Sequence, residues 1–299
     1  MSILITVPGA DFSAIGNPKV NKLLYGVPAD NLEALYLFES GTVGEAYAGP
    51  ATDRSGRGND APLIPGSVAF KTAGGVATSL DRVTRTGGLA VFSPVPLTDK
   101  FTVFGISRNL LPPEAVTSGT VYVIPWSASG DWNTPAQPLM SNPNRGSLNG
   151  GDGLLHINQQ TSPTGTIAEM GALSFRGTPN NTQAWGGGQV RPGPQMAGTP
   201  KDSYIAWALS FDRSAGYTFR ALGGGHTIAS PEDAAVWIDY QKSVGARHVF
   251  GAVGYTSQTV IGEIAMAGIY KNVTKTAAEM DVLIASLKSR MALRGISAL

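Results

Sequence analysis

The chain has 299 residues, enough to bury a continuous hydrophobic core, so an entirely disordered protein is excluded. Only 14% of the residues are charged and 38 are glycine, a composition that favours many strands and turns. The net charge of +1 provides no large field to attract nucleic acid or an anionic membrane. The absence of cysteine excludes disulfides and thiolate metal sites.

Residues 1–30 are expected to form an N-terminal arm ahead of the main domain. Ile3, Ile5 and Val7 alternate as they would in a strand, and Pro8 ends this run. No basic residue precedes the run and it is too short for a signal peptide, and no stretch of the chain is apolar for long enough to span a membrane. An exposed strand can extend another sheet, so the arm is suited to docking on a neighbouring subunit.

Residues 31–299 are expected to form one β-sandwich domain. Short apolar segments alternate with clusters of Gly, Pro, Asn and Ser, which is typical of sandwiches and barrels. Residues 35–38 are apolar throughout and are predicted to lie between two covering layers. The clearest strand is 203–211, in which one face carries Ile205, Trp207, Leu209 and Phe211 and the other carries Tyr204, Ala206, Ala208 and Ser210.

One helix is expected, over about residues 276–294. Thr276 and Glu279 stand at the spacing of a capping box at its start, and Gly295 can provide a left-handed stop. The apolar residues recur at three- and four-residue spacing, which indicates an amphipathic helix. They are Met280, Leu283, Ile284, Leu287 and Met291.

A series of segments follows in a recognisable order: strand-like 35–39, turn-like 52–60, strand-like 101–104, the hairpin 204–219, strand-like 260–270 and the helix after Thr276. This series resembles the laminin-G-like or concanavalin A-like jelly rolls of lectins, pentraxins and bacteriophage virion proteins. The resemblance covers residues 32–296. It implies an all-β fold, a two-sheet antiparallel jelly-roll sandwich, in a structural protein of a phage tail or capsid surface that is assembled in the host cytoplasm.

Two long segments, 127–153 and 177–200, are crowded with Gly, Pro and Asn and are expected to be surface loops. Trp132, flanked by Asp131 and Asn133, is the first candidate for glycan binding, because sugar rings stack on aromatic faces while amides and carboxylates bind hydroxyls. Trp185 offers the same in the second segment. The alternative is that each tryptophan pins its own loop or lies at a subunit contact. Trp126, Trp207 and Trp237 are expected in the core.

Candidates for catalysis are few. Glycan hydrolases need two carboxyl groups across the scissile bond, and Glu263 has no second acidic residue at the spacing that related glucanases display. Glu232 and Asp233 follow Pro231 and are expected at a turn or a helix start. The sequence therefore predicts a protein that is not an enzyme.

Metal and cofactor sites are not expected either. Asp53, Asn59 and Asp60 provide too few oxygens for calcium and are expected to bond to nearby backbone in tight turns. The three histidines are far apart in sequence and form no metal motif. His156 and His248 are expected as hydrogen-bonded side chains of a sheet, and His226 is expected in a turn.

These observations favour a non-enzymatic virion protein that packs with itself, as a homo-oligomer, and with other virion proteins, and whose loops are available to a host glycan. A bacterial carbohydrate-binding module or adhesin is the alternative, although it would need export. A glycoside hydrolase is the third possibility, opposed by the missing carboxylate pair.

Overall fold

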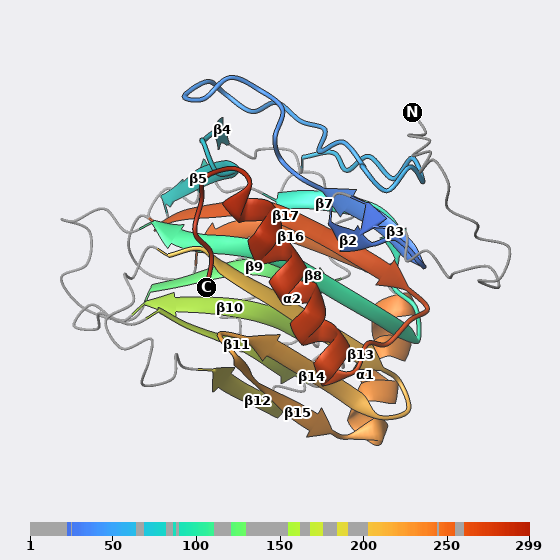
Figure 1. The fold of residues 1–299 in the computed structure, drawn as a ribbon. Helices are drawn as coiled ribbons and strands as arrows, with labels where there is room; N and C mark the ends of the chain where they lie inside the picture. Colours follow the sequence, from blue (N-terminus) through green and yellow to red (C-terminus); the bar gives the residue numbers. More distant parts are fainter. Residues whose placement is uncertain are drawn as a thin grey trace, which may run out of the picture.

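The computed structural model confirms the predicted all-β sandwich: two antiparallel sheets lie face to face, and a helix covers the outer face of one of them (Figure 1). The structure describes residues 23–24, 26–63, 69–81, 86–87, 90–110, 121–129, 155–161, 168–175, 184–190, 203–243, 245–254 and 260–299.

The larger sheet has nine strands. They are β3 (Leu32–Tyr36), β4 (Phe70–Lys71), β5 (Val76–Asp81), β6 (Thr86–Gly87), β8 (Lys100–Leu110), β13 (Ile205–Asp212), β14 (Gly216–Ala221), β15 (Gly224–Ala229) and β17 (Val260–Lys271). The spatial order is β15-β14-β13-β8-β17-β5-β4, with β3 also paired to β17 and β6 to β5. Central neighbours such as β8 and β17 are far apart in sequence, so the sheet forms only when distant segments meet.

The smaller sheet has six strands. They are β7 (Ala90–Pro96), β9 (Val121–Ser129), β10 (Leu155–Thr161), β11 (Ala168–Phe175), β12 (Ala184–Val190) and β16 (Arg247–Gly254). The spatial order is β12-β11-β10-β9-β16-β7. Each neighbouring pair is antiparallel.

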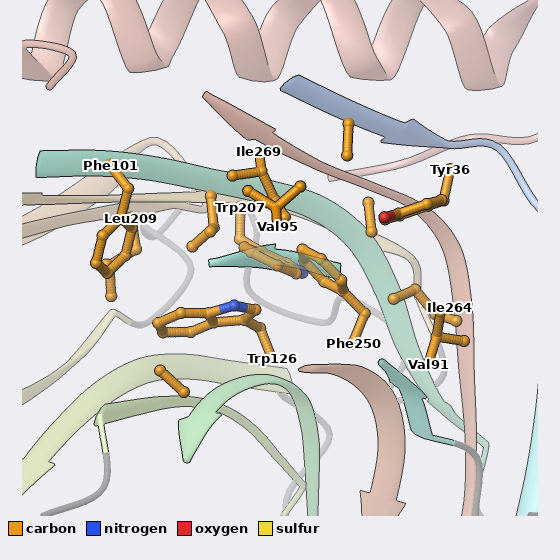
Figure 2. Close-up of a cluster of buried hydrophobic side chains, with 14 of the residues drawn as sticks. Tyr36, Val91, Val95, Phe101, Trp126, Trp207, Leu209, Phe250, Ile264 and Ile269 are labelled. Atoms are coloured by element: carbon orange, nitrogen blue, oxygen red, sulfur yellow. The ribbon is translucent and has the colours of Figure 1, made fainter. Parts of the chain in front are cut away.

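The core between the sheets follows from the alternation predicted for β13. Its inward residues are fully buried and belong to one cluster with side chains of the six-stranded sheet (Figure 2). Phe101 of β8 links the two layers, because its ring stacks on Phe211 at 5.0 Å between centroids and lies 6.0 Å from the ring of Trp126. The inward residues of β13 are Ile205, Trp207, Leu209 and Phe211.

The opposite face of the nine-stranded sheet packs under helix α2 (Ala277–Ala292) (Figure 1). The alternate residues at β13 contact the buried stripe of the helix in a second apolar cluster. The predicted capping box is present, since the Thr276 hydroxyl accepts from the Glu279 N–H and the Glu279 carboxylate accepts from the Thr276 N–H. The predicted helix is therefore confirmed. Its buried residues are Met280, Leu283, Ile284, Leu287 and Met291.

Residues 35–38, which begin within β3, lie between two layers, as their continuous apolar sequence predicts. Tyr36 belongs to the cluster between the sheets, whereas Leu35 belongs to the cluster under α2. Both side chains are fully buried.

A second helix, α1 (Pro231–Ser243), follows β15. Glu232 and Asp233 lie in its first turn, which confirms the helix start that was one of the two alternatives predicted for them, whereas the length of the helix was not predicted. Its buried face includes Trp237, whose ring packs on Phe211 at 4.9 Å. The prediction of Trp126, Trp207 and Trp237 as core residues is confirmed, because all three are fully buried.

Most of the predicted arm, residues 1–22, lies outside the described residues. A short hairpin follows, formed by β1 (Leu23–Leu24) and β2 (Val27–Pro28). Val27 is buried in the cluster under α2, and the Tyr270 hydroxyl donates to the Pro28 carbonyl at 2.7 Å. The chain is thus attached to the sandwich before residue 30. Within the described residues, neither helix has the length and hydropathy needed to cross a membrane.

Candidate functional site

The predicted glycan-binding residues follow or belong to strands of the six-stranded sheet. Asp131, Trp132 and Asn133 lie outside the described residues, two to four positions after the end of β9 at Ser129. Trp185 lies in β12, one residue after the strand begins, so the prediction of a surface loop over residues 177–200 was wrong for residues 184–190. The backbone pairing of this sheet therefore decides whether the two segments leave it together.

The strand register places the described residues on either side of both segments at the same end of the sheet. Ala128, next to the end of β9, pairs with Leu155 at the start of β10. Leu155 pairs with Ser174 near the end of β11, and Ser174 pairs with Gly186 near the start of β12. Segments 130–154 and 176–183 thus connect strand ends that form one row across the sheet. Four strands at about 4.8 Å spacing bring these ends within about 15 Å of one another.

Two further features mark this end of the sheet. Ser129 pairs with Arg247, so the connection from α1 to β16 is also here. Trp185 is the extra residue of a β-bulge, because Ser174 pairs with Gly186 and Phe175 pairs with Ala184. Bulges are frequent at sheet edges and next to functional sites, where they change the direction of the chain.

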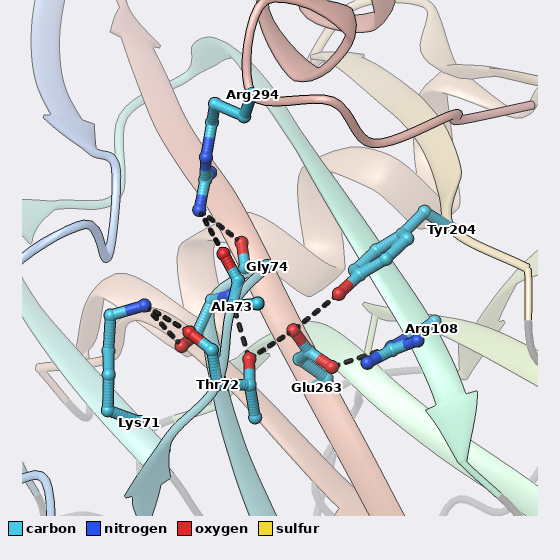
Figure 3. Close-up of polar contacts among 9 residues, drawn as sticks. Lys71, Thr72, Ala73, Gly74, Arg108, Tyr204, Glu263 and Arg294 are labelled. Carbon is cyan, nitrogen blue, oxygen red and sulfur yellow. Dashed lines mark hydrogen bonds and ion pairs between the residues drawn. The ribbon is translucent and has the colours of Figure 1, made fainter. Parts of the chain in front are cut away.

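A separate polar cluster surrounds Glu263 of β17 beneath the turn that joins β4 to β5 (Figure 3). The Glu263 side chain is fully buried. Its Oε1 accepts from the hydroxyls of Thr72 and Tyr204, each at 2.6 Å, and its Oε2 accepts from Arg108 Nε at 2.6 Å. Both carboxylate oxygens are therefore occupied by strong donors. Sequence reasoning missed these partners, because they are far from Glu263 in the chain.

The same turn is held from its other side. Lys71 Nζ donates to the carbonyls of Thr72 and Gly75, the latter at 3.1 Å. Arg294, just beyond α2, donates to the carbonyls of Ala73 and Gly74 at 3.2 and 2.7 Å (Figure 3). The cluster thus joins the turn, three strands and the end of α2.

Gly74 shows how closely this turn fits over the carboxylate. A Cβ atom at Gly74 would lie 1.7 Å from the Tyr204 hydroxyl and 2.8 Å from Glu263 Oε1. Burial, followed by the charge and the hydrogen bond of Glu263, raises the pKa of Tyr204 above its usual value, so the phenol stays protonated and donates. We interpret this arrangement as a structural hydrogen-bond cluster rather than a reactive site, because the carboxylate is enclosed and both of its oxygens accept hydrogen bonds.

The acidic turn near Asp53 is confirmed as a self-bonded structure. Asp53 Oδ1 accepts from the N–H groups of Leu35 and Ser55, and its Oδ2 accepts from the Asn59 N–H. Asp60 Oδ1 accepts from the Asp53 N–H at 2.7 Å. Burial raises the pKa of Asp53, but these hydrogen bonds outweigh it, and the pKa lies below its usual value. The described residues contain no group of three or more metal-binding side chains.

The histidines differ from the predictions. His248 of β16 is fully buried, but neither ring nitrogen has a hydrogen-bond partner within the described residues, so the expected hydrogen bond was wrong. Its ring lies edge-on to the ring of Phe101, with 5.0 Å between the ring centroids, so its neighbour there is aromatic. His226 lies in β15 against Tyr217 and Phe219, not in a turn. His156 lies in β10, as expected.

Comparisons with known proteins concern the fold. No model of a protein family matches the chain, and no curated protein matches it in sequence. Among solved structures, the chain is similar to the binding domain of botulinum neurotoxin DC in complex with rat synaptotagmin II, with a TM-score of 0.50 and 9% identity over 87% of this chain and 52% of that one.

Two further similar structures have the same pattern. One belongs to botulinum neurotoxin type C, whose cell entry depends on interaction with two ganglioside molecules, with a TM-score of 0.50, 10% identity and coverage of 87% of this chain and 52% of that one. The other is the structure of a receptor binding domain, with a TM-score of 0.52, 10% identity and coverage of 87% of this chain and 51% of that one. The chain spans about half the length of these structures. At such low identity the similarity establishes the β-sandwich fold.

Proposed function

We propose that this protein is a non-catalytic glycan-recognition protein, displayed in several copies on a phage particle. The observation that supports it is the register of the six-stranded sheet, which places the strand ends before and after residues 130–154 and 176–183 at one end of the sheet. The first segment contains Trp132, with Asp131 and Asn133 on either side of it. Trp185 lies two residues after the second segment. An aromatic platform flanked by amide and carboxylate groups suits a sugar ring and its hydroxyls.

Similar structures lend support to recognition rather than catalysis. One similar structure concerns a botulinum neurotoxin whose cell entry depends on two ganglioside molecules, and another is of a receptor binding domain. The buried carboxylate of Glu263 is enclosed beneath a turn and has both oxygens engaged. Both observations favour a binding surface formed by loops on a rigid sandwich.

The virion assignment rests on the sequence resemblance and on the predicted arm. A rigid sandwich with an extra segment of alternating apolar residues suits a particle in which copies dock on one another. Display in several copies would raise the avidity of weak single sites.

Glycan binding is tested by calorimetric titration with bacterial O-polysaccharides and a ganglioside oligosaccharide. Calorimetry is preferred because the key variants remove a tryptophan fluorophore. We expect Trp132→Ala to weaken binding about tenfold or more, since aromatic anchors carry a large share of binding energy. Trp185→Ala should weaken it as well.

The matched control is Asn149→Ala in the same segment as Trp132, which should bind as the wild type does. Unchanged binding by both tryptophan variants would contradict this site. Release of reducing sugar from a polysaccharide that binds would contradict the non-catalytic assignment.

The arm is tested by deleting residues 1–22 and comparing particle mass by light scattering. The deletion should stop at residue 22 because Val27 is buried under α2, so a longer deletion would damage the sandwich. We expect the truncated protein to fold normally and to lose large assemblies. Identical assembly of both proteins would remove the role proposed for the arm.

A further inference from the structure

We propose that the outward face of α2 is a contact surface between two copies of this chain, in which the two helices pack antiparallel. The proposal rests on the self-association included in the proposed function, but not on glycan binding. It concerns described residues only. Figure 1 shows α2 as the outermost layer over the nine-stranded sheet.

The first observation is exposed apolar surface on one line of the helix. Val282 and Leu293 are 63% and 81% exposed, among the most exposed large hydrophobic residues that the structure describes. They are separated by eleven positions, which is about three helical turns, so they lie on the same side. The inward stripe of α2 is already buried on the sheet, and these two side chains are not needed for that contact.

Small side chains along this face of α2 make close helix packing possible. Exposed positions recur along this face at alternating spacings of four and three, the spacing of a helix-to-helix seam. Small side chains at most of these positions would let a second helix approach to about 8 Å, the near end of the usual interaxial range. The seam residues are Ala278, Val282, Ala285, Ser289 and Ala292.

The charges on one flank of the seam are complementary to those of a second copy of the same helix. Asp281 and Lys288 lie along the same flank, one turn before and one turn after Ala285. In an antiparallel pair the same flank of both helices meets, so Asp281 of each copy faces Lys288 of the other. A parallel pair would bring no such opposite charges together. Asp281 already pairs with Arg220 at 2.7 Å, yet its side chain is 48% exposed and accessible to a second cation.

This surface adjoins the predicted arm. The hairpin at residues 23–28 contacts α2, and the position for a Cβ on Gly26 lies 4.0 Å from the Ser286 carbonyl. The chain therefore enters the described structure beside the proposed seam.

The expected contact is weak. A 16-residue helix pair buries less surface than the roughly 800 Å² per partner of a standard interface, so a concentration-dependent dimer is expected. Sedimentation equilibrium on the full chain between about 5 and 500 µM should show monomers converting to dimers. The 1–22 deletion should give the same equilibrium, which separates this contact from any assembly through the arm.

Charge reversal tests the antiparallel arrangement. Lys288→Asp places two like-charged pairs across the seam and should weaken the dimer about tenfold. Adding Asp281→Lys should restore association. Val236→Glu, at an exposed position of α1, is the matched control and should leave the equilibrium unchanged.

Cross-linking tests the register, because the chain contains no cysteine. Ala285→Cys lies near the two-fold axis and should form a disulfide-linked dimer under mild oxidation, since a disulfide needs Cα atoms about 4.4–6.8 Å apart. Val236→Cys should not cross-link. A wild type that stays monomeric at every concentration overturns the proposal. The proposal is also overturned if the wild type dimerises, Lys288→Asp does not change its dimerisation, and Ala285→Cys forms no disulfide-linked dimer. Glycan titration of the Lys288→Asp variant reports separately on the recognition site.

Discussion

The imidazole of His248 is fully buried beside Phe101 and Trp126, and neither ring nitrogen has a hydrogen-bond partner within the described residues. Burial, with a smaller contribution from the positive charge of Arg247, lowers the pKa of His248 to about 3. The folded protein therefore keeps this ring neutral over a pH range in which the unfolded chain, with an ordinary histidine pKa of about 6.5, takes up a proton.

The buried, neutral His248 therefore destabilises the folded protein in acid. As pH falls below about 6.5, the unfolded state gains protons that the folded state cannot accept, and His248 costs about 1.4 kcal/mol of stability per pH unit until its folded pKa is reached. Between pH 6.5 and 5 this loss is about 2 kcal/mol. We expect His248→Leu to remove it. Urea unfolding at pH 7.5 and 5 should show a smaller acid loss in the variant, and equal losses would refute the assignment.

Glu263 is the second residue whose environment predicts a large effect. Glu263→Gln keeps the shape of the side chain but removes the charge that Arg108 contacts at 2.6 Å. It also replaces an acceptor of the Tyr204 and Thr72 hydroxyls by an amide that must donate on one side. We expect a loss of about 2–4 kcal/mol in the free energy of unfolding, measured in urea.

The control for this variant is Glu45→Gln, at an exposed carboxylate, which should change stability by less than about 0.5 kcal/mol. Similar stabilities of the Glu263 and Glu45 variants would mean that the cluster contributes nothing to the fold. Normal glycan binding by a folded Glu263→Gln protein is also expected, because the hydrogen-bond cluster is structural.

At the level of elements, the start of α2 provides a sharp test. Thr276 caps the helix reciprocally with Glu279, and this capping box satisfies backbone N–H groups that the helix cannot. We expect Thr276→Ala to cost about 1 kcal/mol, seen as a lower urea midpoint with an unchanged slope. Ser289→Ala, at an exposed position inside the same helix, should have no such cost. Equal midpoints for both variants would show that the cap is dispensable.

Elements whose pattern is local were predictable from the sequence. The alternation at β13 and the stripe and cap of α2 are contained in consecutive residues, and the structure confirms both. Helix α1 also has buried residues at helical spacing, including Ala234, Trp237 and Ile238. Its helical period is therefore contained in residues 231–243, beyond the helix start that Glu232 and Asp233 indicate.

Contacts between distant segments were not predictable in this way. The partners of Glu263 are separated from it by 59 to 191 positions, so no spacing rule joins them. The pairing that places Trp185 in a bulge of β12 likewise depends on the register with β11. A strand register follows from packing in three dimensions, and a single sequence contains only the alternation of faces.

At the scale of the whole molecule, the two sheets share one core. Phe250 of the six-stranded sheet lies with its ring 6.0 Å from that of Tyr36 in the nine-stranded sheet. Side chains of both sheets belong to the same buried cluster (Figure 2). Neither sheet can keep its inner face away from water without the other, so we expect them to unfold as one cooperative unit.

This cooperativity can be tested with one substitution on each side. Phe250→Ala should remove about 3–5 kcal/mol from the free energy of unfolding, because it leaves a cavity between the sheets. Native-state hydrogen exchange should then show that the most protected amides of β17 and of α2, on the far side of the nine-stranded sheet, lose protection by the same amount as those of β16. Leu283→Ala, in the cluster under α2, should in turn lower protection in β16, because global unfolding exposes every amide equally. If Phe250→Ala weakened protection in β16 while β17 and α2 kept theirs, the sheets would be independent units and the shared core would not govern stability.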